Sequence, residues 1–206
     1  SSLVRERGMP WPKRVAFKVL RAGRWAQNLL FQSGSVVQTL LFHRLPKTSG
    51  LRRRWPLPGV EKDQVVPRLA RKSFRRRHQE YIAAARESEP VVLFTGCSAN
   101  YIYPRIAESA LWTLHRFDRS VHIAGGQMCC GAPAESHGDQ ETVHELARQN
   151  LTALASRFPQ APVIVLCSSG GYMFKRIYPE LFTSGEEGRL AAALARRTYD
   201  ISEYLV

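Results

Sequence analysis

Four cysteines are spaced along the second half of the chain in a way that could bring their thiols to one place. Cys129 and Cys130 are adjacent and lie in a glycine-rich stretch that ends in Gly131. Between Cys97 and Cys129 there are 31 residues, and between Gly131 and Cys167 there are 35. Each interval is long enough for a helix and a strand, so the cysteines can occupy equivalent positions in successive β-α units. Thiolates gathered in this way bind metal ions and iron–sulfur clusters.

The elements that must position these thiols alternate from residue 90 onward. Short apolar runs predict buried strands, and apolar residues at helical spacing predict helices between them. We predict strands at residues 91–96, 120–124 and 162–166, a helix that begins at Pro104, and helices at residues 139–157, 171–177 and 186–205. This order predicts an α/β fold over residues 91–206, with a small parallel sheet and flanking helices.

A parallel sheet would place the four cysteines along one edge. The loops that leave the carboxyl ends of parallel strands share that edge, where ligands characteristically bind. Cys97 follows the first strand, Cys129 and Cys130 lie a few residues after the second, and Cys167 directly follows the third. Nearby helix N-termini would favour the thiolate form. Each cysteine alone could instead be a small buried hydrophobic residue, but the four together predict a shared site.

Several side chains near the cysteines are candidates for supporting roles. Ser168 and Ser169 could donate hydrogen bonds to cluster sulfur, or could simply form a turn. Asn100, Tyr101 and Tyr103 follow Cys97 closely and could shield the site from water.

A further candidate ligand is His137, which lies six residues after Gly131, although a histidine there is more often a helix-start or surface residue. The sequence contains no Ser-His-Asp set, P-loop or G-x-G-x-x-G motif. Nucleophilic and nucleotide chemistry therefore have no support from motifs.

The positive charge of the chain is concentrated in its first half. Residues 1–90 carry 20 Lys and Arg against 6 Asp and Glu, whereas residues 91–206 carry 10 against 11. We therefore predict two regions, a basic helical connector or docking region at residues 1–89 and a cysteine-rich domain at residues 90–206. Such a charge is also the electrostatic footprint of nucleic-acid binding, but no motif that reads nucleic acid is present, and nucleic acid is the least favoured partner.

Residues 10–31 predict a basic amphipathic helix. Its basic side would carry Lys13, Arg14, Lys18, Arg21 and Arg24, and its apolar side Val15, Val19, Ala22, Ala26 and Leu29. Such a helix either packs on its own protein with the basic side in solvent, or docks on a membrane surface or a partner. We further predict an apolar segment at residues 36–42, an irregular linker at residues 46–67 and a helix at residues 68–87.

The ends of the sequence and its cysteine content bear on its setting. The chain begins with Ser rather than Met, which suggests a trimmed or partial chain, and no signal peptide or membrane-spanning run is evident. Four cysteines are too few for a disulfide scaffold, and an adjacent pair serves one poorly. We therefore expect a reducing, cytoplasmic setting in which the thiols are available as ligands.

These motifs resemble the cysteine-rich CCG domain of the heterodisulfide reductases, which also occurs in the iron–sulfur subunits of anaerobic glycerol-3-phosphate dehydrogenase, glycolate oxidase and the lactate-utilisation proteins. The family pattern is Cys, about thirty residues, Cys-Cys-Gly, about thirty-five residues, then Cys-x-x-Cys. Here Cys97, Cys129-Cys130-Gly131 and Cys167 fall in that register. The likeness covers residues 91–206, and extends more loosely back to Pro67–Phe74.

The resemblance implies electron transfer by a component that is not itself catalytic. It implies that Cys97, Cys129, Cys130 and Cys167 hold an iron–sulfur cluster, with 4Fe–4S as the expected type. The implied partners are a flavoprotein dehydrogenase subunit, other iron–sulfur subunits and a membrane surface or quinone-reducing partner, at the inner face of the membrane. The implied complex oxidises a small hydroxy acid or glycerol phosphate. This chain would be the connector and the first of two cysteine-rich domains.

One residue departs from the family pattern. Gly170 stands where the family has its last Cys, so four of five usual thiolates remain. Four suffice for a 4Fe–4S cluster, a 2Fe–2S cluster or a tetrahedral zinc ion. The alternative function is therefore a structural or partner-docking module that holds zinc or no metal.

Overall fold

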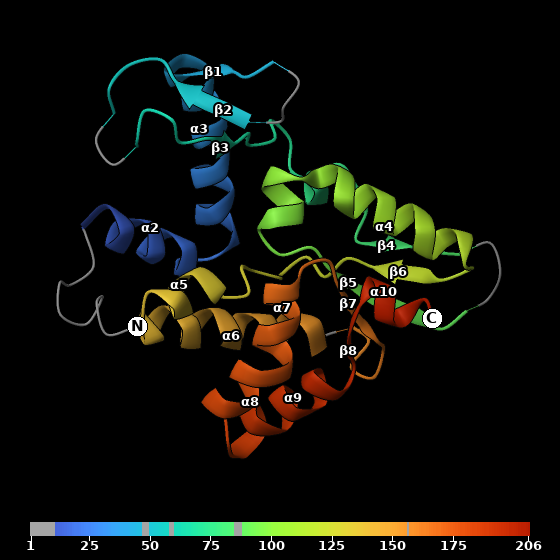
Figure 1. The fold of residues 1–206 in the computed structure, drawn as a ribbon. Helices are drawn as coiled ribbons and strands as arrows, with labels where there is room; N and C mark the ends of the chain where they lie inside the picture. The colour runs from blue at the N-terminus through green and yellow to red at the C-terminus, as the bar shows by residue number, and fades with distance from the viewer. Residues whose placement is uncertain (1–10, 47–49, 58–59, 85–87, 156) are drawn as a thin grey trace.

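The computed structural model describes residues 11–46, 50–57, 60–84, 88–155 and 157–206. Its central element is a five-stranded sheet with the order β4-β6-β5-β7-β8 (Figure 1). The strands are β4 (Tyr81–Ile82), β5 (Pro90–Phe94), β6 (Ser120–His122), β7 (Val163–Val165) and β8 (Thr198–Asp200). Strands β6, β5, β7 and β8 are parallel, and β4 pairs antiparallel with β6. The predicted α/β fold with a parallel sheet is confirmed.

The strand β5 lies in the middle of the sheet and is buried on both faces. Val91, Val92, Leu93 and Phe94 are each at most 1% exposed. Val92 and Phe94 belong to the core on one face, and Val91 and Leu93 to the core on the other face. A continuous apolar run, rather than an alternating one, is what a parallel strand covered on both faces requires.

Helices cover both faces of the sheet (Figure 1). The helices are α4 (Pro104–Arg116), α5 (Ala132–Ser136), α6 (Gln140–Ala155), α7 (Ser168–Tyr172), α8 (Tyr178–Leu181), α9 (Gly185–Arg196) and α10 (Ile201–Tyr204), with the π-helical turns η2 (Ser98–Ile102) and η3 (Met173–Ile177). Helix α4 packs on one face through Ala107, Ala110 and Leu114. Residues of α6, η3 and α9 form the core on the other face. The predicted helices at Pro104 and at residues 139–157 are confirmed.

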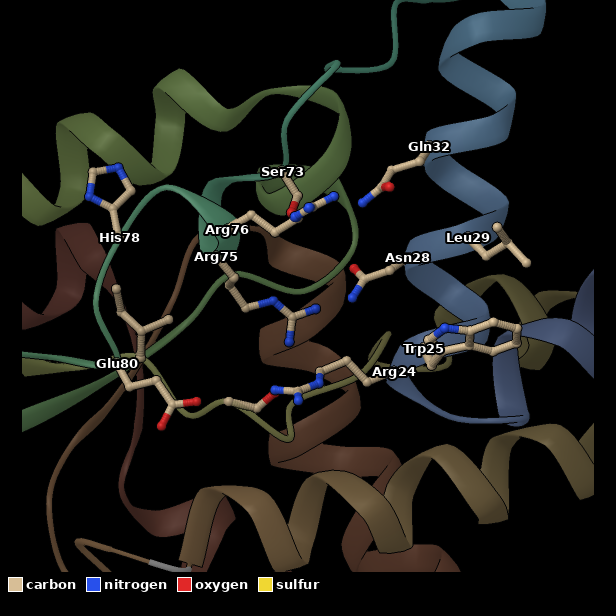
Figure 2. A pocket seen from close by; sticks show the side chains of 12 residues that line it. Arg24, Trp25, Asn28, Leu29, Gln32, Ser73, Arg75, Arg76, His78 and Glu80 are labelled. Carbon is tan, nitrogen blue, oxygen red and sulfur yellow. The ribbon is translucent and has the colours of Figure 1, made fainter.

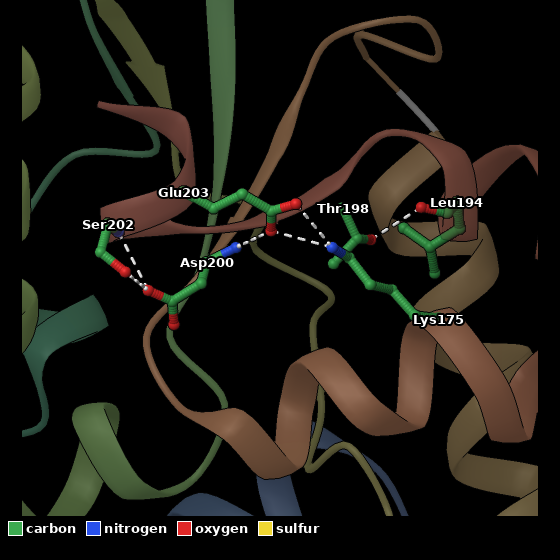
Figure 3. A network of polar contacts seen from close by, with 6 residues as sticks. All are labelled: Lys175, Leu194, Thr198, Asp200, Ser202 and Glu203. Carbon is green, nitrogen blue, oxygen red and sulfur yellow. Dashed lines mark hydrogen bonds and ion pairs between the residues drawn. The ribbon is translucent and has the colours of Figure 1, made fainter. Parts of the chain in front are cut away.

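The predicted helix at residues 186–205 was wrong in its second half. Helix α9 ends at Arg196, and the chain then forms β8 and the short helix α10. Figure 3 shows how α10 begins: Asp200 Oδ1 accepts from the Ser202 N–H at 2.9 Å, and Glu203 Oε2 accepts from the Asp200 N–H at 3.2 Å. This reciprocal capping box starts a new helix after a strand. Lys175 Nζ contacts Glu203 at 2.8 Å and ties α10 to η3.

The predicted basic helix at residues 10–31 is two helices. Helix α2 (Trp11–Arg21) and helix α3 (Arg24–Leu41) meet at Gly23, whose φ of 106° favours glycine. Because the chain changes direction at this break, the two helices do not bury one continuous apolar side. Val15 and Leu29 are 51% and 53% exposed, while Phe17 is buried in the main core. The apolar side predicted from one continuous helix was therefore wrong.

Helix α2 packs on the cysteine-rich part of the chain. Arg21 forms an ion pair with Glu141 of α6, and Gln149 Nε2 donates to the Arg21 carbonyl at 3.1 Å. Of the two roles considered for the basic helix, α2 therefore has the first: it packs on its own protein. Arg14 and Lys18 are exposed on its outer side. Helix α3 also includes most of the apolar segment predicted at residues 36–42.

The rest of the connector differs from prediction. Strands β2 (Gly50–Arg53) and β3 (Val66–Pro67) lie where an irregular linker was predicted, and with β1 (Phe42–Arg44) they form a small antiparallel sheet. Residues 68–84 contain only the 3₁₀ turn η1 (Phe74–Arg76) and β4 rather than the predicted helix, and residues 85–87 lie outside the described residues. The helix is lost because the Ala70 and Arg75 N–H groups bond to the Tyr101 carbonyl and to Asn100 Oδ1 instead.

The connector contributes to the central sheet through β4, which comes from residues before 90. The predicted domain boundary between residues 89 and 90 stays a prediction. Within the described part of the chain, no helix has the length and apolar character needed to cross a membrane.

Candidate metal centre

Three loops carry the four cysteines, and each leaves the carboxyl end of a parallel strand. Cys97 follows β5 and precedes η2, Cys129 and Cys130 follow β6, and Cys167 follows β7 and precedes α7. Strand β5 lies between β6 and β7, so the Cys97 loop is flanked by the other two. The prediction that the four cysteines follow the carboxyl ends of three parallel strands is confirmed.

Two of the thiols are in contact. Cys97 Sγ lies 3.6 Å from Cys129 Sγ, whereas Cys130 packs in the main core beside Ala134 and Val143. All four cysteines are free of disulfides. Cys129 and Cys130 are buried, whereas Cys97 and Cys167 are half-buried. Two thiolates on one tetrahedral metal ion lie about 3.8 Å apart for metal–sulfur bonds of about 2.3 Å, so the Cys97–Cys129 spacing fits thiolate ligation.

Cys167 is not brought into contact with the other three. Its sulfur accepts a hydrogen bond from Ser169 Oγ at 3.5 Å; the predicted bond from this serine to cluster sulfur stays a prediction. Among the described residues, no three or more Cys, His, Asp or Glu side chains are arranged so that they could hold one metal ion. The thiols are donors of the kind that a metal centre uses, but the full ligand set of Cys97, Cys129, Cys130 and Cys167 stays a prediction.

The pKa values of Cys97, Cys129 and Cys130 are shifted in different directions. The neighbouring Cys129 thiol lowers the pKa of Cys97, and the Ser98 N–H and the positive charge of Arg75 act in the same direction. The pKa of Cys130 is lowered by Cys129 and by the Ala132 N–H. The pKa of Cys129 is raised by Cys130, by Cys97 and by burial. Cys97 and Cys130 therefore lose their protons more readily than Cys129 does.

The Cys129-Cys130 turn is held from behind by α6 and α8. Asn150 Oδ1 accepts from the Met128 N–H at 2.7 Å, and Asn150 Nδ2 donates to the Cys129 carbonyl at 2.9 Å. The Tyr178 hydroxyl donates to the Cys130 carbonyl at 3.1 Å and accepts from Asn150 Nδ2 at 3.0 Å. These hydrogen bonds fix the backbone that presents both thiols.

Gln127 joins the Cys129 loop to the Cys97 loop. Its side-chain oxygen accepts from the Thr95 N–H at 2.7 Å and the Thr95 hydroxyl at 3.1 Å. Its Nε2 donates to the Leu93 carbonyl at 3.1 Å. Gln127 is fully buried, so a single side chain sets the distance between two of the cysteine loops. Neither Gln127 nor Asn150 was predicted, although a polar residue amid the apolar positions of helix 139–157 was a usable signal.

The connector covers the Cys97 loop. Tyr101 is 2% exposed, donates to Asn28 Oδ1 of α3 at 2.6 Å and stacks on Phe31 with ring centroids 4.1 Å apart. Asn100 is also buried, whereas Tyr103 is 41% exposed. Two of the three residues considered for shielding are therefore buried beside Cys97, and Tyr103 is at the surface.

His137 lies away from the predicted ligands. Its ring contacts Phe17 at 5.6 Å edge-on, and its Nδ1 lies 2.8 Å from the Pro133 carbonyl. These contacts place it at the C-terminal end of α5 against α2, so the predicted helix-start position was wrong.

Comparisons with known proteins match this part of the chain. Residues 91–175 match the family model described as "CCG: Cysteine-rich domain". Lactate utilization protein A 2 of Bacillus cereus (strain AH820) is 31% identical over 118 residues, which cover 56% of this chain and 47% of that protein. Lactate utilization protein A 1 of Bacillus anthracis (strain CDC 684 / NRRL 3495) is 30% identical over a stretch of the same length and coverage.

A third relative is an uncharacterized iron-sulfur protein of Methanococcus maripaludis. It is 29% identical over 121 residues, which cover 59% of this chain and 24% of that protein. The chain thus matches about half the length of the Bacillus relatives. No solved structure gives a significant match.

Proposed function

We propose that this chain, whose residues 91–175 match the CCG cysteine-rich domain model, is part of an iron–sulfur subunit that transfers electrons within an oxidoreductase. The observation that carries the proposal is the contact of Cys97 Sγ with Cys129 Sγ, at the ends of two adjacent parallel strands. Relatives named as an iron-sulfur protein and as lactate utilization proteins support it.

The residues that would hold the cluster are Cys97, Cys129, Cys130 and Cys167, and 4Fe–4S is the proposed type. An iron–sulfur cluster supplies reversible one-electron transfer when bound. The lowered pKa values of Cys97 and Cys130 ease the loss of the protons that a metal would displace. Burial of Cys129 and Cys130 keeps water from the sulfur atoms, because their side chains are 1% and 5% exposed.

The wider setting of the subunit is a further part of this proposal. We propose that its complex is flavin-linked and quinone-coupled, and acts on a small hydroxy acid or glycerol phosphate. Flavoprotein and other iron–sulfur subunits are the proposed partners. The exposed Arg14 and Lys18 of α2, within the basic half of the chain, support docking on a partner or on anionic lipid at the cytoplasmic side of the membrane.

Metal analysis tests the proposal. The protein is purified anaerobically without added metal, and iron, acid-labile sulfide and zinc are measured with the visible spectrum. We expect iron and sulfide in similar amounts and broad visible absorption that dithionite bleaches. Repeated absence of iron and sulfide would contradict an electron-transfer role.

A structural or partner-docking module that holds zinc or no metal is the second candidate function. Gly170, in place of the last cysteine of the motif, favours it, and the described residues assemble no complete metal-binding group, which favours its metal-free form. One zinc ion per chain, or no metal, with no visible absorption would establish this alternative, because zinc has no redox chemistry.

A further inference from the structure

A cavity of about 480 Å³ lies between α3 and the segment that joins η1 to β4. Its polar lining comes from two stretches that are far apart in the sequence: Arg24, Asn28 and Gln32 of α3, and Ser73, Arg75 and Arg76 around η1. Gly125, at the start of the loop that carries Cys129, also lines it. Figure 2 shows Asn28 and Gln32 extending from α3 toward Arg75 and Arg76.

The cavity has an excess of positive charge. Arg24, Arg75 and Arg76 line it together with a single carboxylate, that of Glu80. None of the three guanidinium groups is part of an ion pair within the described segments. His78 adds little, because burial lowers its pKa. The lining therefore attracts anions.

Two of the three guanidinium groups are held in place by the main chain. Arg24 Nη1 donates to the Gly125 carbonyl at 2.9 Å, and Arg75 Nη1 donates to the Gln127 carbonyl. A guanidinium has five N–H donors, so each of these groups keeps donors for a ligand. The charges are thus positioned before any ligand arrives, which lowers the entropic cost of binding.

The cavity also contains a buried hydroxyl without a partner. Ser73 is 2% exposed, and its Oγ has no hydrogen-bond partner among the described residues. A buried polar atom without a partner costs about 1–3 kcal/mol. Asn28 Oδ1 accepts from Tyr101, which leaves its amide N–H groups for the cavity. These groups add neutral donors to the three guanidinium groups.

We propose that this cavity binds a small oxyanion, either a carboxylate or a phosphate. Guanidinium groups match the planar carboxylate and the tetrahedral phosphate with paired hydrogen bonds. Arg75 links the cavity to the cysteines, because its backbone N–H bonds to Asn100 and its guanidinium bonds to the Gln127 carbonyl. The bound anion would lie next to the loop that presents Cys129. This inference does not depend on which metal the cysteines hold.

Calorimetric titration of the full chain tests the proposal. Inorganic phosphate and acetate are the probes, glycerol is the neutral control, and ionic strength is held constant with chloride. The test variant is Arg76→Gln, because no hydrogen bond or ion pair to another described residue holds the Arg76 side chain, so its loss spares the fold. The matched control is Arg196→Gln, which removes the same charge from an exposed position at the end of α9.

We expect saturable binding of at least one anion and none of glycerol. Arg76→Gln should weaken binding about tenfold or more, the effect of one charge-assisted hydrogen bond, whereas Arg196→Gln should leave it unchanged. Binding of phosphate alone identifies a phosphate ligand, and binding of acetate alone identifies a carboxylate. The proposal is overturned if neither anion saturates at tens of millimolar, if Arg76→Gln binds as wild type does, or if Arg196→Gln weakens binding equally. Iron content is not a readout, so this result is separable from that of the electron-transfer proposal.

Discussion

Asn150 is the buried amide that holds the Cys129-Cys130 turn, and removing it tests how the site is built. Asn150 is fully buried in α6. Its side chain accepts from the Met128 N–H at 2.7 Å and donates to the Cys129 carbonyl at 2.9 Å. Asn150→Ala leaves both backbone groups without their partner in the protein interior. Tyr178 loses one hydrogen bond but keeps the other, to the Cys130 carbonyl.

The expected loss of stability follows from the Met128 N–H and the Cys129 carbonyl, which lose their partner. Each buried group left without a partner costs about 1–3 kcal/mol, so Asn150→Ala should lower the free energy of unfolding by roughly 3 kcal/mol. Asn150→Asp keeps the size of the side chain and can still accept from Met128, but it places a carboxylate oxygen against the Cys129 carbonyl. A comparable loss in Asn150→Asp would show that the missing donor matters, rather than the volume removed.

Urea unfolding followed by far-ultraviolet circular dichroism measures these changes. Gln149→Ala, at the next position of α6, is the matched control, because Gln149 is half-buried and its loss should cost less than about 1 kcal/mol. The m value should be the same in all variants. A loss in Asn150→Ala no larger than that in Gln149→Ala would refute the inference that Asn150 holds the turn.

Three further predictions follow from other positions. Gly170→Cys adds a thiol beside Cys167 and should change the visible spectrum of the anaerobic protein relative to Gly170→Ala. Identical spectra would contradict the inference that position 170 lies close enough to the metal centre to supply a ligand. Gly131→Ala should lower the unfolding free energy by about 1–2 kcal/mol, because Gly131 has a φ of 94°, whereas Gly171→Ala should not lower it in the same urea assay. Burial raises the pKa of Tyr178, so the phenol ionises at a lower pH in the unfolded chain, and the free energy of unfolding should fall as the pH rises above about 10. Tyr178→Phe should flatten this fall above pH 10. An unchanged slope in Tyr178→Phe would contradict the role of Tyr178.

The parts of the fold that were predicted correctly are those with a long apolar pattern. Strand β5 leaves a continuous apolar run in the sequence, and helix α6 leaves apolar residues at helical spacing. Strand β4 has only two residues, and β8 places a single aromatic residue between Thr198 and Asp200, so neither has an apolar run that predicts a strand. The helix predicted at residues 68–87 failed because hydrogen bonds to residues 100 and 101 outweighed local helix preference.

The sequence predicts where the cysteines of the candidate site lie, but not which side chains hold their loops in place. The cysteines could be placed because strand ends in a parallel sheet share an edge, and Cys97 and Cys129 do lie in contact. Gln127 and Asn150 act through single buried amide groups, which leave no repeating pattern. The arginines of the cavity look like an ordinary charged stretch in the sequence, because only the fold brings Arg24 next to Arg75.

The most direct test of the central claim is the electron paramagnetic resonance spectrum of the anaerobic protein before and after reduction by dithionite. Wild type is compared with Cys129→Ser, which removes the thiol that contacts Cys97, and with Ser33→Ala, a change at an exposed position of α3. We predict an iron–sulfur signal in wild type and Ser33→Ala that is lost or altered in Cys129→Ser. The same signal in all three proteins, or no signal in any of them, would contradict a cluster held by these cysteines.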